Sequence, residues 1–96
     1  MNKLPDDIQQ DIAIAKLILF KYGCKAMYLF GSLVDGTFTE RSDIDIAVIG
    51  IRKADFFKVY GEILHETHRS IDLICLDFDT DFSKQLKETG KFEQVA

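Results

Sequence analysis

The stretch from Asp43 to Ile49 constrains the fold of this chain more than any other, because acidic and apolar residues alternate at its start. Successive side chains of a strand point to opposite faces of a sheet. Asp43 and Asp45 would therefore point to one face, and Ile44 and Ile46 to the other. The pattern predicts a strand with two carboxylates on one face and core contacts on the other.

Two carboxylates on one face of a strand repel each other unless something offsets their charge. Like charges about 4 Å apart cost about 4 kcal/mol at an effective dielectric near 20. Protonation of one carboxyl, or exposure of both to solvent, would relieve the repulsion without any function. A divalent cation would relieve the repulsion and would also imply a function, since Mg²⁺ binds one or two carboxylates together with phosphate oxygens and water.

A third aspartate, Asp72, lies inside the apolar run from Ile71 to Leu76. Aspartate is disfavoured both in strands and in buried positions, so its presence there needs a reason. An ion pair with Arg69 or Arg52 is one explanation. The other is that this strand lies beside the strand of Asp43 and Asp45, which would gather three acids at one site.

The remaining pattern predicts helices and strands around these acids. Proline and two acids mark a helix start near residue 5, and glycine marks its end at Gly23. The pattern then predicts a short buried strand, Ala26–Phe30, that ends at Gly31-Ser32. After the strand of Asp43 and Asp45 it predicts a helix over Lys53–His68, with Phe56, Phe57 and Tyr60 in the core. A strand over Ile71–Leu76 and a helix over about Asp81–Glu88 follow. The order predicts one α/β or α+β domain over residues 1–96, with a small mixed sheet covered by helices.

Composition excludes several classes of function. The net charge of −4 argues against a general nucleic-acid-binding protein, which would carry a basic patch. No apolar run approaches the roughly 20 residues of a membrane span, and the first residues are too acidic for a secretory signal. Cys24 and Cys75 lack metal-ligand spacing, so we expect free buried thiols in a reducing compartment, the cytoplasm.

The acids also fit a known motif. Gly31-Ser32, ten intervening residues and then Asp43-Ile44-Asp45 resemble the signature of polymerase-beta-type nucleotidyltransferases. Gly36 and Ser42 fall where that family often carries glycine and serine, and the strand around Asp72 resembles its third-acid strand. The similarity is greater to the minimal (MNT-type) nucleotidyltransferases.

The resemblance implies a role for each motif residue. Gly31, Ser32 and Ser42 would bind the triphosphate of a nucleotide, most simply ATP. Asp43 and Asp45 would bind Mg²⁺, and Asp72 would complete the metal site or accept the proton of the attacking hydroxyl. Such a site suits attack on an α-phosphate, in which positioning and charge neutralisation provide most of the catalysis.

The resemblance also implies a partner. Minimal nucleotidyltransferases act as antitoxins for HEPN-domain toxins, some by adenylylating the toxin. The apolar stripe of the first helix, formed by Ile12, Ile14, Ile18 and Phe20, is a candidate surface for a partner or a second copy. Leu33 and Asp35 depart from the family, which often has basic residues there. An alternative is therefore a weakly active module that neutralises its partner by docking alone.

Overall fold

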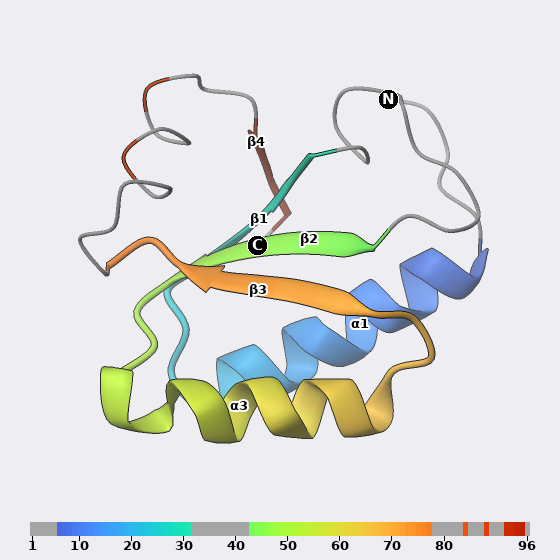
Figure 1. Cartoon of the computed structure of the whole chain (residues 1–96), viewed down its shortest axis with the longest axis horizontal. Coiled ribbons are helices and arrows are strands. Elements are labelled where there is room, and N and C mark those ends of the chain that lie inside the picture. Colours follow the sequence, from blue (N-terminus) through green and yellow to red (C-terminus); the bar gives the residue numbers. More distant parts are fainter. Residues whose placement is uncertain (1–5, 32–42, 78–83, 85–87, 89–91, 96) are drawn as a thin grey trace.

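The computed structural model describes residues 6–31, 43–77, 84, 88 and 92–95. Within them the chain forms two long helices and four strands (Figure 1). In chain order these are α1 (Asp6–Lys21), β1 (Ala26–Phe30), β2 (Ile44–Ile49), α3 (Lys53–Glu66), β3 (Ile71–Cys75) and β4 (Phe92–Gln94). The predicted strands therefore form as expected, and β4 is an additional one that the pattern did not reveal.

The four strands form one mixed sheet in the order β3-β2-β1-β4. β1 runs antiparallel to both β2 and β4, whereas β2 and β3 are parallel. Parallel neighbours need a crossover connection, and α3 provides it. This β2–α3–β3 unit places β3 at one edge of the sheet, directly beside β2.

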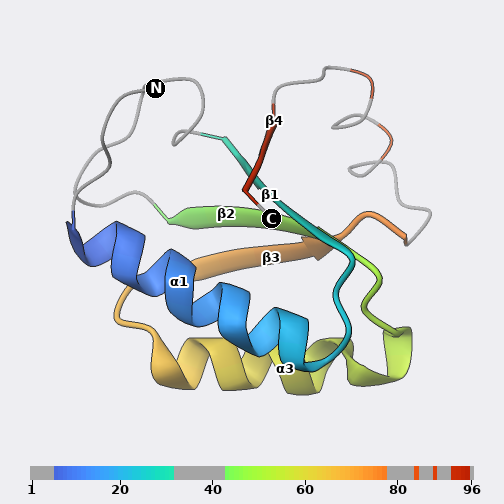
Figure 2. The same ribbon diagram turned by 180° about the vertical axis from the view of Figure 1, so that it is seen from behind.

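Both helices cover the same face of the sheet (Figures 1 and 2). A small cluster of Phe30, Ala47 and Leu76 is buried on the opposite face. The main core lies between the sheet and the helices and takes alternate residues from the strands. Its largest fully buried apolar side chains are Ile8, Leu19, Met27, Ile44, Ile46, Val48, Val59 and Ile63. The small mixed sheet covered by helices, predicted from the sequence, is confirmed.

Helix α1 begins with Asp6 and Asp7 and ends with Lys21, so its terminal charges complement the helix dipole. The apolar stripe that we expected to be a docking surface is partly covered within the domain, and docking on it stays a prediction. Ile18 belongs to the core, and Ile12 and Ile14 pack against the core. Of the four stripe residues only Phe20, 41% exposed, presents much surface, because a helix beside a sheet buries the face nearest the strands.

Helix α3 contributes Phe56, Val59 and Ile63 to the core. Phe57 was expected in the core as well, but it is 82% exposed because the residue after a core-facing position points away from the sheet. The helix ends at Glu66, where the backbone N–H of Thr67 donates to the carbonyl of Ile63. His68 lies beyond this end, in the turn that leads to β3.

Three further expectations concern the two cysteines, the predicted last helix and the absence of a membrane span. Cys24 and Cys75 are buried and take part in no disulfide, as predicted. The predicted last helix, over about residues 81–88, lies largely outside the described residues. Among the described helices, none is long and apolar enough to cross a membrane.

Candidate active site

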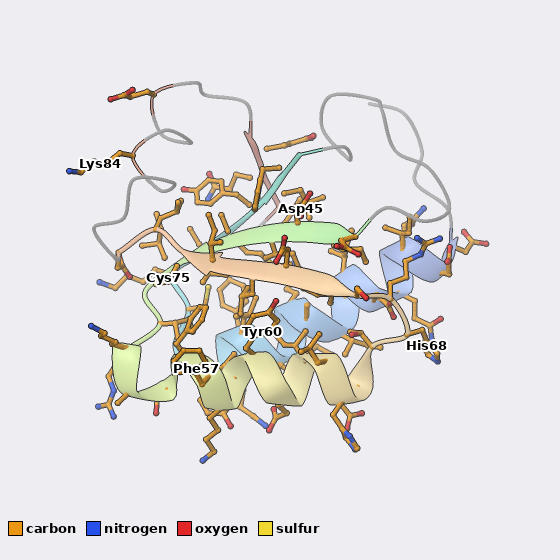
Figure 3. The ribbon with its side chains drawn as sticks, viewed as in Figure 1. Asp45, Phe57, Tyr60, His68, Cys75 and Lys84 are labelled. Atoms are coloured by element: carbon orange, nitrogen blue, oxygen red, sulfur yellow. The ribbon has the colours of Figure 1, made fainter. Side chains whose placement is uncertain are left out.

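The register of β2 and β3 brings two of the predicted acids together. Asp45 pairs directly with Asp72 across these parallel strands. Residues that pair across a sheet point to the same face, and here that is the face away from the helices. Figure 3 shows Asp45 on this side of the sheet, with Tyr60 of α3 on the other. Ile44, the residue preceding Asp45, is fully buried on the helix side.

Asp43 stands immediately before β2, two residues from Asp45 and exposed to solvent. It was expected inside the strand, but the regular ladder begins one residue later. Its negative charge still acts on Asp45. The pKa of Asp45 is raised from 3.8 to about 6 by burial first, then by the charges of Asp72 and Asp43. The three carboxylates therefore form one acidic cluster.

Gly31 packs directly against this cluster from the end of β1. The neighbouring residue, Phe30, pairs with Asp45 in the sheet. A Cβ atom on Gly31 would collide with Oδ2 of Asp45 and would lie 3.1 Å from its Cγ. Gly31 also has a φ of +71°, which residues with a side chain rarely adopt. Both the space and the backbone conformation therefore require glycine here.

The structure thus gathers Gly31, Asp43, Asp45 and Asp72 at one end of the sheet face opposite the helices. Ser32 and Ser42, the other two predicted nucleotide-binding residues, lie outside the described residues, as do Leu33 and Asp35. The contact between Gly31 and the Asp45 carboxylate is not evident from the sequence, because the pattern relates a glycine at this strand end only to phosphate binding. Its proximity in space depends on the pairing of β1 with β2.

The two arginines that could have formed an ion pair with Asp72 form salt bridges with other aspartates. Nε of Arg69 lies 3.0 Å from Oδ2 of Asp7, and Nε of Arg52 lies 3.2 Å from Oδ2 of Asp55. Asp72 is exposed to solvent on the sheet face away from the helices. Its exposure and its position beside Asp45 favour the shared-site explanation.

The acidic cluster has the donors that a hard divalent cation prefers. Within the described part of the chain, no three His, Cys, Asp or Glu side chains stand close enough to hold a metal ion by themselves. Mg²⁺ does not require this, because it commonly binds one or two carboxylates and takes its remaining ligands from phosphate and water. The pairing of Asp45 with Asp72 and the mutual repulsion of the cluster therefore fit a cation that arrives with a nucleotide.

Comparison with known proteins places this geometry in a family. The model of the polymerase beta nucleotidyltransferase domain matches residues 13–92, most of the chain. The chain belongs to the polymerase beta nucleotidyltransferase family. This confirms the family predicted from Gly31-Ser32 and the aspartates, and it identifies the chain as a nucleotidyltransferase domain.

Solved structures of low sequence identity share the fold of this nucleotidyltransferase. A toxin–antitoxin complex with AMP-PNP matches with a TM-score of 0.66 and 21% identity, over 94% of this chain and 72% of that one. The MntA–HepT toxin–antitoxin complex matches with a TM-score of 0.63 and 19% identity, over 90% and 69%. A protein from Shewanella oneidensis matches with a TM-score of 0.57 and 22% identity, over 94% and 68%. The search of curated proteins found no match.

Proposed function

We propose that this chain is a divalent-metal-dependent nucleotidyltransferase that transfers AMP from ATP to a hydroxyl group of a toxin partner, and so acts as its antitoxin. The observation that carries the proposal is the pairing of Asp45 with Asp72, with Asp43 beside them, on the sheet face opposite the helices of a nucleotidyltransferase fold. Mg²⁺, when bound with the triphosphate, would neutralise the phosphate charge.

Each residue of the cluster has a distinct task in this proposal. Asp43 and Asp45 hold the cation, and Asp45, whose burial and acidic neighbours already raise its pKa, gains most from a positive charge. Gly31 and Ser32 bind the triphosphate through the end of β1, assisted by Ser42. Glycine suits this role because it lets the backbone approach both the carboxylate and a phosphate.

Asp72 is the residue that faces the acceptor in this proposal. Its carboxylate is exposed beside Asp45, where it completes the metal site or accepts the proton of the acceptor hydroxyl. The hydroxyl oxygen forms a bond to the α-phosphorus as the bond to pyrophosphate breaks. The proton passes to the carboxylate, and AMP remains on the acceptor.

Two observations support a protein partner. The described residues form one sheet with two long helices on one face, and they include no second lobe to provide an acceptor hydroxyl. The similar solved structures include the MntA–HepT toxin–antitoxin complex, and a further toxin–antitoxin complex contains AMP-PNP. A HEPN-domain toxin is accordingly the partner that we propose.

A labelling experiment tests this function. The chain and the toxin encoded beside it are incubated with Mg²⁺ and ATP labelled at the α-phosphate, and the toxin is analysed by intact mass. We expect the mass of one or more AMP groups on the toxin, and a loss of at least about 100-fold in rate with Asp45→Asn. Asp55→Asn is the matched control, because Asp55 lies on α3 in an ion pair with Arg52.

The alternative is neutralisation by docking alone, which Leu33 and Asp35 favour because cations near the triphosphate are missing there. Rescue of toxin-expressing cells separates the two functions. If wild type and Asp45→Asn rescue growth equally and the toxin carries no label, docking is the function and transfer is refuted. Rescue that is lost together with the label supports transfer.

A further inference from the structure

Helix α1 carries a carboxylate that the proposed chemistry does not use. Asp11 is fully buried, although it is acidic and lies on the core-facing side of the helix between Ile8 and Ala15. Burial of an isolated carboxylate is costly unless hydrogen bonds compensate for the lost water. The location of those hydrogen bonds therefore indicates what the residue is for.

The partners of Asp11 are backbone groups at the entrance to β3. The N–H of Arg69 donates to Oδ2 of Asp11 at 2.8 Å, and the N–H of His68 lies 3.1 Å from Oδ2 and 3.2 Å from Oδ1. Nδ1 of the His68 ring lies 3.4 Å from Oδ1. Both oxygens of one buried side chain thus bind the turn that joins α3 to β3.

Two further hydrogen bonds hold the next residues of the same segment. The N–H of Ile44 in β2 donates to the carbonyl of Ser70 at 3.0 Å. The hydroxyl of Tyr60 in α3 donates to the carbonyl of Ile71 at 2.6 Å. Residues 68–71 are therefore fixed in turn by α1, β2 and α3, and the next residue is Asp72.

We propose that Asp11 is a positioning residue for Asp72, one that sets the start of β3 so that the Asp72 carboxylate lies beside Asp45. This inference rests on the proposed function, because it matters for catalysis only if Asp45 and Asp72 share a cation or substrate. Asp11 touches neither carboxylate and acts through the backbone of residues 68–71. Residues behind the direct ligands commonly alter metal affinity in this way.

The test compares Asp11→Asn with a matched variant, Leu19→Ala. Asparagine has the size of aspartate, but it is uncharged and only one of its two terminal atoms accepts, so it loses the second acceptor and the negative charge that the N–H groups of His68 and Arg69 now contact. Leu19 is equally buried in the same helix two turns away, and its truncation destabilises the core without touching this turn. Both proteins are studied well below their melting temperatures, with circular dichroism to confirm that each is folded.

The first readout is amide hydrogen exchange at the two ends of the β2–β3 pair. The Ile44 N–H reports the end near Asp72, and the Leu76 N–H, which donates to Val48 at 2.8 Å, reports the far end. In Asp11→Asn we expect Ile44 to exchange about tenfold faster relative to Leu76. In Leu19→Ala the ratio should remain that of wild type. Equal acceleration of both amides in Asp11→Asn, or no change, overturns the proposal.

The second readout is Mn²⁺ binding, measured by electron paramagnetic resonance. We expect Asp11→Asn to weaken binding about tenfold, and Leu19→Ala to change it less than about twofold. Equal affinities of Asp11→Asn and wild type would overturn the proposal. If wild type binds no Mn²⁺ even with a nucleotide, the proposed function fails, and the exchange ratio still decides what Asp11 does to β3. Should Asp11→Asn not fold, Tyr60→Phe removes one hydrogen bond from the same segment and should change both readouts in the same direction.

Discussion

Replacement of Asp45 by asparagine should make the metal-free protein more stable at about pH 7.5 while removing one ligand of the proposed metal site. The pKa of Asp45 is raised from 3.8 to about 6 by burial and by the charges of Asp72 and Asp43. Each pH unit of such a difference corresponds to about 1.4 kcal/mol, so the ceiling is about 3 kcal/mol. Solvent reaches part of this carboxylate and screens its neighbours, which reduces the expected gain to about 1 kcal/mol.

The sign of the pH dependence follows from the direction of the pKa change. Below about pH 4 the carboxyl is protonated in both the folded and the unfolded chain, so it does not lower the free energy of unfolding. Between about pH 4 and 6 the folded protein retains a proton that the unfolded chain releases, so its free energy of unfolding falls as pH rises. Above about pH 6 the full penalty is present. Asparagine cannot ionise, so the variant should lack this decline.

Urea denaturation in EDTA at several pH values between about 4 and 8 measures the effect. The gain of about 1 kcal/mol should appear as a melting temperature about 4–8 °C higher in a domain of this size. Asp55→Asn is the control, and its stability should change by less than about 1 kcal/mol because its ion pair lies at the surface. If Asp45→Asn is less stable than wild type at neutral pH, or shows the same decline between pH 4 and 6, the reasoning about the acidic cluster is wrong.

Three further predictions concern the same region. Gly31→Ala should cost at least about 2 kcal/mol and abolish Mn²⁺ binding, because its Cβ would collide with the Asp45 carboxylate at a positive φ; Gly61→Ala, in an open helical position, should instead stabilise by about 0.5–1 kcal/mol in the same urea experiment. Tyr60→Phe should cost about 1 kcal/mol through the lost hydrogen bond to Ile71, and an unchanged urea midpoint would show that this bond contributes nothing. Saturating Mg²⁺ with a non-hydrolysable ATP analogue should raise the melting temperature of wild type by several degrees but not that of Asp45→Asn; equal shifts in calorimetry would place the ligand elsewhere.

Much of this architecture follows from local patterns. Alternation at residues 43–46 predicted β2 and the opposite orientation of Asp45 and Ile44, and the apolar run around Asp72 predicted β3. Both signals are strong because a strand buried on one face leaves little freedom in which residues point inward. The pairing of Asp45 with Asp72 was inferred as one of two explanations, since the sequence carries no direct record of which strands are neighbours.

What the sequence left hidden depends on contacts between distant segments. Strand β4 is only three residues long and lies at the sheet edge, so its own pattern is too short to distinguish it from a loop. Phe57 follows a core position and looks apolar, yet it faces solvent. The sequence shows that Asp11 is an acid on the apolar side of a helix, which indicates a special role. It does not show the hydrogen-bond partners of Asp11, because they lie more than fifty residues away.

The apolar core and the acidic cluster depend on the same parallel register of β2 and β3. A change in that register would therefore disturb both. If one residue were inserted between α3 and β3 and displaced the strand by one position, Asp72 would enter the main core, while Ile71, Leu73 and Cys75, each less than 5% exposed, would leave it for the opposite face of the sheet. Descendants with such a change would lose folding and chemistry together. Natural variation in the length of this connection should therefore either be absorbed in the loop or occur in steps of two residues.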